Sequence, residues 1–249
     1  MAEFVSITAD GDIAVVGIDR PPANAMDPQL LEEGRAAVGE LEQMEPAAVV
    51  LHGRPGFFSA GLDLKVTPTL DADGRRALVE GINGLFTAWY GLPMPVVCAV
   101  GGHAIAGGLI LALCGDWRVV GRSGRFGLTE LKAGVPYPAA ASAIVRAELS
   151  PVAARRLMLR ADLTDAARAL ADGVFDEQVD DDQVIDRAME MATELAALPA
   201  AAYARTKRDL RGGTLAELQR AMEADADSLA GDWVAEDAGE RAGRILGSG

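Results

Sequence analysis

In the first half of the chain, segments with the hydrophobic periodicity of a strand alternate with segments that have the periodicity of a helix. Two β-rich runs at residues 4–8 and 13–18, joined through Asp10-Gly11, predict an opening β-hairpin. Asp27-Pro28 then offers an N-cap and a first-turn proline, so we expect a helix from there. Its apolar positions recur at helical spacing as far as Leu41.

Short apolar strands are expected at residues 47–52, 96–100 and 117–120, with a helix at residues 74–90. The segment GRPGFFSAG after the first of these strands is expected to be a loop. The stretch from Pro95 to Cys114 is long and apolar enough for a membrane span. Its proline, its glycine pairs and His103 favour a buried strand, a glycine turn and a short buried helix instead. The order of strands and helices predicts an α/β fold.

The second half of the chain is mostly helical in pattern. Ser150-Pro151 and Thr164 predict two helix starts, and residues 175–179 predict a last strand. From Asp181 onward nearly the whole sequence is helix-forming. We therefore expect an α/β core at residues 1–198 and a helical region at residues 199–249, with the boundary where the strand pattern has ended.

Composition narrows the classes of function. The chain has 249 residues, is 50% hydrophobic and carries a net charge of −14, which excludes wholesale disorder and a general nucleic-acid binder. Cys98 and Cys114 are too few for a disulfide scaffold, and no C-x-x-C spacing indicates zinc. The first residues lack the pattern of a secretory signal, so a cytoplasmic protein is expected.

Two glycine-bearing segments are candidates for chemistry, at residues 57–65 and 101–119. In both, small residues precede an apolar segment with the pattern of a helix start. Such turns leave backbone N–H groups unpaired and let a ligand approach the main chain. Two such groups that point at one spot form an oxyanion hole.

These segments belong to a set of motifs that resembles the crotonase superfamily, the enoyl-CoA hydratase/isomerase family. RPPANAM, FSAGLDL, GGHAIAGGLILALCGDWRV and FGLTELKAGVPYP resemble four family motifs, in the family's order and spacing. The resemblance implies a crotonase-like (ClpP/crotonase) α/β spiral of ββα units. It also implies C-terminal helices that build a homotrimer or a dimer of trimers.

The resemblance further implies an acyl-CoA thioester as substrate, with coenzyme A as part of the substrate and with no separate cofactor or metal. The thioester oxygen would be held by the backbone N–H groups of Leu62 and Gly107. Glu130 would be the catalytic carboxylate, since its apolar neighbours can raise its pKa. Contacts with coenzyme A would come from six residues, namely Ala23, Ala60, Gly61, Asp63, Leu64 and Lys65.

The expected reaction follows from a missing carboxylate. The family's hydratases hold a water between two glutamates, and the position of the first is Ile110 here. One base suffices to move a proton from C2 to C4 of a 3-enoyl thioester. AGGLILALCGD and GLTE resemble the single-glutamate 3,2-enoyl-CoA isomerases more than the hydratases. An enoyl-CoA hydratase of fatty-acid oxidation, a hydrolase and a non-catalytic acyl-CoA-binding paralogue are the alternatives.

Other residues are expected to contact phosphate, to line the pocket or to have structural roles. Arg20, Arg54 and Lys65 are candidates for phosphate contacts, and Lys207 resembles a family lysine on the C-terminal helices. His103 and residues 70–86 are expected in the pocket wall. Asp63 is expected to cap a helix, Asp116 to be a structural hydrogen-bonding group, and His52 to be structural. Apolar residues recur on one side of the last helices and predict a buried face there, at Leu215, Leu218, Met222 and Leu229.

Overall fold

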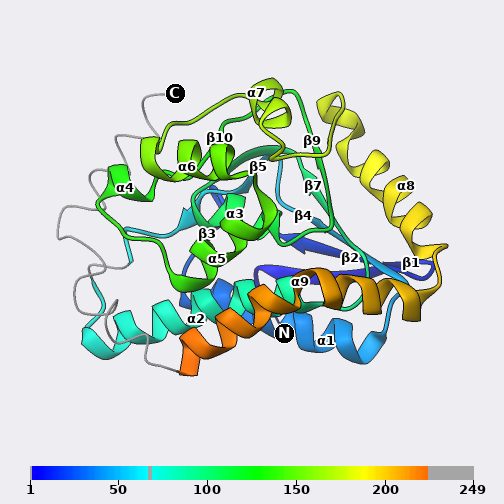
Figure 1. Ribbon diagram of the computed structural model, residues 1–249, viewed down its shortest axis with the longest axis horizontal. Coiled ribbons are helices and arrows are strands. Elements are labelled where there is room, and N and C mark those ends of the chain that lie inside the picture. Colours follow the sequence, from blue (N-terminus) through cyan, green and yellow to red (C-terminus); the bar gives the residue numbers. More distant parts are fainter. Residues whose placement is uncertain (1, 67–68, 224–249) are drawn as a thin grey trace.

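The computed structural model describes residues 2–66 and 69–223, and its strands form three sheets (Figure 1). The largest has the order β1-β2-β4-β7-β9-β11. Its strands are β1 Val5–Asp10, β2 Ile13–Ile18, β4 Ala48–His52, β7 Val96–Val100, β9 Trp117–Val120 and β11 Glu177–Gln178. Only β1 and β2 pair antiparallel; the other neighbours in this sheet are parallel. The opening hairpin and the strands at residues 96–100 and 117–120 are thus confirmed.

Two smaller parallel sheets lie beside the first. One has the order β10-β8-β5, formed by Phe126–Gly127, Gly102–Ile105 and Gly56–Ser59; the other pairs β3 Ala25–Met26 with β6 Gly61–Leu62. The predicted loop after β4 and the predicted glycine turn after β7 were therefore wrong, since both contain a strand. A Cβ on Gly102 would lie 2.2 Å from the carbonyl carbon of Gly56, so this glycine permits a close approach of two strands.

Strand and helix alternate in a repeated unit. Among the described residues, a strand of the main sheet is followed by one or two short strands of the smaller sheets and then by a helix, four times along the chain. The helices of these units are α1 Pro28–Met44, α2 Ala72–Gly91, α3 Gly107–Leu113 and α4 Glu130–Ala133. This arrangement is the spiral of ββα units that the sequence predicts. It brings the start of α3 beside β6, where the ligand site is expected.

Helices cover both faces of the main sheet (Figure 1). The helix α8, Val184–Ala196, lies on one face and packs on alternate strand residues such as Val50 and Val97. The other face is covered by a larger core that includes α1, Pro28–Met44, and α2. Asp27 caps α1 as predicted, because its carboxylate accepts the Leu30 N–H at 2.8 Å. The remaining helices are α5 Ala139–Glu148, α6 Pro151–Arg160, α7 Ala166–Ala171, η2 Asp181–Gln183 and α9 Ala200–Glu223.

The last described helix, α9, lies across α2 and α5 (Figure 1). Leu218 is buried there and Leu215 packs against the core, whereas Leu210 is 81% exposed and Met222 is also exposed. The predicted apolar face is thus buried in part on the chain's own core. Leu229 lies outside the described residues.

Buried charges fix α9 to the core. The Lys207 ammonium donates to the Asp116 carboxylate at 2.6 Å and to the Met94 carbonyl at 2.8 Å. Arg211 pairs with the same carboxylate at 3.1 Å and donates to the Cys114 carbonyl at 2.9 Å. Asp116 is therefore the structural group that the sequence predicts. Lys207 lies on α9, among the C-terminal helices as the resemblance implies, and it is held inside the protein.

The stretch from Pro95 to Cys114 forms β7, β8 and α3, as the prediction against a membrane span requires. In the described part of the chain, no helix combines the length and the apolar character needed to cross a bilayer.

Candidate active site

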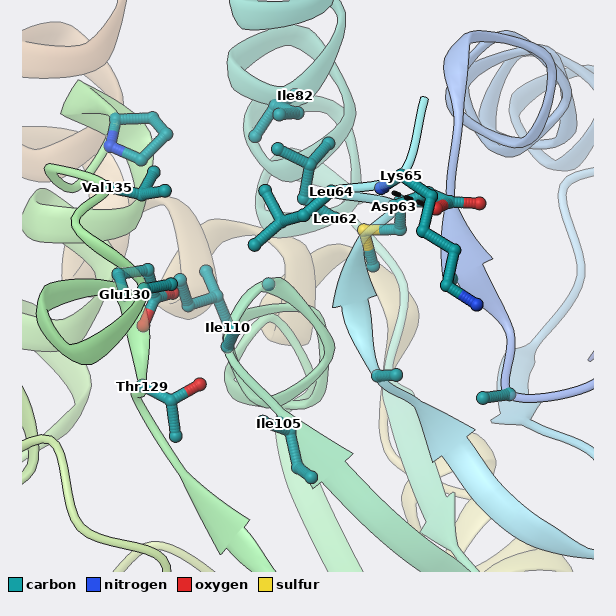
Figure 2. Close-up of a pocket in the computed structure, with 18 of the residues that line it drawn as sticks. Leu62, Asp63, Leu64, Lys65, Ile82, Ile105, Ile110, Thr129, Glu130 and Val135 are labelled. Carbon is teal, nitrogen blue, oxygen red and sulfur yellow. Dashed lines mark hydrogen bonds between the residues drawn. The ribbon is translucent and has the colours of Figure 1, made fainter. Parts of the chain in front are cut away.

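One cavity of about 230 Å³ gathers most of the predicted site residues (Figure 2). It lies between β3, the turn after β6, α2, α3 and α4. The predicted residues that line it are Ala23, Ala60, Leu62, Asp63, Leu64, Lys65, Gly107 and Glu130. Gly61 does not line the cavity but lies directly behind it, against the start of α3. The four sequence motifs therefore meet at a single place.

The junction of β6 and α3 is built from glycines. Gly61 has φ +80°, and a Cβ there would lie 2.8 Å from the Gly107 nitrogen and 2.8 Å from the Ile105 carbonyl oxygen. Only a residue without a side chain allows this approach of two main-chain segments. The Gly107 amide consequently lies next to the residue that precedes Leu62.

The strand β6 and the helix α3 orient the two backbone N–H groups of interest, those of Leu62 and Gly107. The Asp63 N–H donates to the Met26 carbonyl of β3 at 2.8 Å, and successive amides of a strand point to opposite sides. The Leu62 N–H therefore points away from β3. Gly107 opens α3, where the first amides have no acceptor within the helix. Before it, Ala106 has φ 53° and ψ −128°, a strained conformation for a residue with a side chain.

Glu130 is the first residue of α4 and is 8% exposed. Its carboxyl group faces the cavity in Figure 2. Within the described part of the chain, its Oε2 atom is buried without a hydrogen-bond partner. Burial raises the pKa of this carboxyl group to about 8, which suits a group that must both take and return a proton near neutral pH.

The surroundings of Glu130 are apolar. Ile110 lines the same cavity from α3 and is 1% exposed, so the position of the first family glutamate holds a hydrocarbon side chain. Ile82 and Phe86 of α2 also line this part, as the prediction for residues 70–86 requires, whereas Leu70 does not. Asp63 and Lys65 lie at the other end of the cavity (Figure 2). The cavity thus has one polar mouth and one apolar end with a carboxyl group.

The structure corrects some of the predictions about which arginine and lysine side chains contact phosphate. Arg20 lines the cavity, but its guanidinium pairs with Asp27 at 2.9 Å and with Asp63 at 3.1 Å. Arg54 pairs with Asp19 and does not line the cavity. Two carboxylates already neutralise Arg20, which leaves Lys65, exposed at the mouth, as the candidate for a phosphate contact.

Two other predictions were wrong. His103 does not line the cavity, because its ring stacks on Phe57 at 4.7 Å and accepts the Arg125 N–H at 3.1 Å. Asp63 does not cap a helix, because a turn follows β6 and α2 begins later, capped by Asp71. The Asp63 carboxylate instead accepts the Lys65 N–H at 3.1 Å.

Sequence reasoning missed two polar residues near Glu130. Thr129 lines the cavity beside it, and its hydroxyl is drawn in Figure 2. The Tyr137 hydroxyl lies 3.2 Å from the Leu128 carbonyl oxygen and 3.1 Å from that of Met158. Thr129 could have been found from its place in the motif. Tyr137 gave no such signal, since its contact with α6 depends on the tertiary structure.

Comparison with known proteins places the chain in a family of acyl-CoA enzymes. The family model described as enoyl-CoA hydratase/isomerase matches residues 8–240. A probable enoyl-CoA hydratase EchA17 of Mycobacterium tuberculosis is 36% identical over 212 residues, which are 82% of this chain and 81% of that protein.

Solved structures show the same fold. The crystal structure of a probable enoyl-CoA hydratase EchA3 from Mycobacterium tuberculosis has a TM-score of 0.86 and 31% identity, and covers 92% of this chain and 98% of its own. Human mitochondrial delta3-delta2-enoyl-CoA isomerase also has a TM-score of 0.86, with 25% identity and 99% of both chains covered. Similar proteins thus bear the names of both a hydratase and an isomerase.

Proposed function

This chain is an enzyme of the enoyl-CoA hydratase/isomerase family, and we propose that it converts 3-enoyl-CoA thioesters into 2-enoyl-CoA thioesters. The observation that carries this proposal is the single buried carboxyl group of Glu130 opposite Ile110, at the apolar end of the cavity. A double-bond shift needs one base that takes a proton and returns it. It needs no water held between two carboxylates.

The proposed reaction uses the groups around the cavity in sequence. Ionised Glu130 takes the C2 proton, and the electron pair moves through the thioester carbonyl to its oxygen. The N–H groups of Leu62 and Gly107 hold that oxygen, and one such donor is typically worth about 2.7–4 kcal/mol of transition-state stabilisation. Protonated Glu130 then returns the proton at C4, so the product has the same atoms as the substrate.

The coenzyme A part of the substrate is proposed to follow the polar end of the cavity. Ala23, Ala60 and Leu64 lie along this path with their backbone groups, and Gly61 supports it from behind. The exposed ammonium group of Lys65 is the candidate contact for phosphate. Asp63 stabilises the turn through its bond to the Lys65 amide.

Parallel assays of 3-enoyl and 2-enoyl thioesters test this function. We expect turnover of the 3-enoyl series and little hydration of the 2-enoyl series. The names of relatives such as EchA17 support hydration as a second candidate function. Faster hydration than isomerisation would favour that candidate. Tight binding without turnover of either series would indicate an acyl-CoA-binding paralogue.

Replacing Ile110 by glutamate tests why hydration is weak. If the missing carboxylate is the reason, I110E should raise the ratio of hydration to isomerisation, because a second carboxylate can hold a water beside Glu130. Ile110 is fully enclosed, so the new charge could destabilise the fold by several kcal/mol, and I110Q is the matched uncharged control. A folded I110E enzyme with an unchanged ratio would contradict this explanation.

The chain is also proposed to assemble as a trimer or a dimer of trimers through its C-terminal helices. The exposed apolar side chains of Leu210 and Met222 on α9 support this proposal. Light scattering coupled to size exclusion should give three or six times the chain mass of 25.9 kDa. A stable mass near 26 kDa would contradict the assembly.

A further inference from the structure

The proposed base, Glu130, must carry a negative charge in surroundings that disfavour it. Glu130 must be ionised to take a proton, yet the cavity around it offers hydrocarbon and its Oε2 atom has no hydrogen-bond partner among the described residues. Burial is the main reason that its pKa is raised to about 8. A neighbouring donor that acts on the ionised form would therefore control how much of the enzyme is active at neutral pH.

The Tyr137 hydroxyl is the candidate for such a donor. The left-handed residue Gly134, with φ 76°, ends α4 and turns the chain back, so that Val135 and Pro138 line the cavity while Tyr137 lies between them. The hydroxyl is within 3.2 Å of the Leu128 carbonyl oxygen, two residues before Glu130, and within 3.1 Å of the Met158 carbonyl oxygen.

This hydroxyl has one proton and more acceptors than it can serve at once. The Met158 carbonyl belongs to the last turn of α6, which ends at Arg160, so no amide within the helix donates to it. The Glu130 carboxyl group also interacts with the hydroxyl, which opposes the rise in the pKa of Glu130 caused by burial. Burial and the charge of Glu130 raise the pKa of Tyr137, so the phenol keeps its proton.

We propose that Tyr137 is a positioning residue for Glu130, whose hydroxyl proton turns from the Leu128 and Met158 carbonyls to the carboxylate whenever Glu130 is ionised. When Glu130 is protonated during the reaction, the hydroxyl proton returns to the carbonyls. The device stabilises the ionised base without placing a fixed positive charge in the acyl end of the cavity.

Fixed charges near Glu130 lie farther along the cavity or outside it. The ammonium group of Lys132, on α4 itself, is exposed and pairs with Asp162 at 2.5 Å. Arg160, at the end of α6, pairs with the same exposed carboxylate at 2.9 Å. The charged residues that line the cavity from β3 and the turn after β6 are Arg20, Asp63 and Lys65.

The test is the pH dependence of kcat/KM for a 3-enoyl-CoA thioester in the wild type and in Y137F. This inference rests on the proposed function, in which Glu130 is the base. In Y137F the midpoint should move up by about one pH unit, which lowers kcat/KM at pH 7 about tenfold and leaves the alkaline plateau unchanged. A midpoint that does not move, with the variant folded, would overturn the inference.

Y90F is the matched control, because the Tyr90 hydroxyl also bonds a carboxylate, that of Glu148 at 2.8 Å, away from the cavity. We expect it to leave the midpoint in place. Replacing all three tyrosines by 3-fluorotyrosine keeps the experiment decisive where Y137F does not fold. A stronger donor should lower the midpoint, and an unchanged midpoint would count against Tyr137. Full activity of E130Q, in contrast, would overturn the proposed function itself.

Discussion

Replacement of Glu130 by glutamine is expected to slow isomerisation by orders of magnitude while making the folded chain more stable at alkaline pH. Glutamine keeps the shape of the side chain but cannot take a proton. General-base catalysis contributes typically about 10²–10⁴-fold to a rate, so kcat should fall by that order. Binding of the thioester should change much less, since coenzyme A is proposed to bind at the other end of the cavity. Single-turnover kinetics with a 3-enoyl thioester measures both.

The gain in stability follows from the direction in which folding moves the pKa. The pKa of Glu130 rises from 4.5 in the unfolded chain to about 8 in the folded protein, so folding takes up a proton between these values. The stability that depends on this proton is complete below pH 4.5 and is lost as pH rises to 8. A tenfold change in the proton affinity of one group corresponds to about 1.4 kcal/mol, and E130Q escapes the loss.

Thermal unfolding at pH 5 and pH 9 therefore measures the stability that depends on the proton of Glu130. The melting temperature of E130Q relative to wild type should increase by about 5–10 °C between these conditions. The exposed residue Glu40 provides the control, because E40Q should change neither the rate nor this difference. If E130Q and wild type showed the same pH dependence of stability, the buried, proton-binding state of Glu130 would be refuted.

With Glu130 as the proposed base, the same carboxyl group is expected to set the pH dependence of the wild-type rate. The base form increases as pH rises through about 8, so kcat/KM should rise with it and then level off.

The strands that the sequence predicts well are those with continuous apolar runs. β7 and β9 each combine β-branched residues with complete or nearly complete burial, and such runs have few other solutions. The strands β5 and β8 escaped prediction because their glycines permit close contact between strands rather than a turn. Gly102 faces the backbone of Gly56, which lies 46 positions earlier in the chain, so no local pattern could show the contact.

The candidate site likewise has one part that local sequence predicts and another that depends on long-range contacts. Glu130 and the two backbone amides are carried by local motifs, and those motifs converge on one cavity as predicted. The roles of charged side chains depend on long-range partners. Arg20 is neutralised by Asp27 and Asp63, and only the tertiary structure brings these two carboxylates to its guanidinium. The Tyr137 hydroxyl donates to the Met158 carbonyl of α6, a contact that its own motif does not encode.

Gly61 offers the sharpest test of the oxyanion hole, because a single methyl group there should separate its two donors. In G61A the new Cβ would lie 2.8 Å from the Gly107 nitrogen and 2.9 Å from the Ala106 Cβ. Both neighbours belong to the junction into α3, so the turn carrying Leu62 must move away from it. Loss of one donor typically costs about 10²–10³-fold in kcat, and we expect a decrease of at least that order.

The matched control is G56A. Gly56 has φ +81°, almost the same as the +80° of Gly61, but a Cβ there meets no atom within 4 Å. Both variants force alanine into a left-handed conformation, which costs roughly 1–2 kcal/mol of stability. Only G61A also pushes on the start of α3. The kcat of both variants for a 3-enoyl thioester, measured with their free energies of unfolding, separates strain from displacement. Equal kcat values in two folded variants would show that the Leu62 and Gly107 amides do not hold the thioester oxygen.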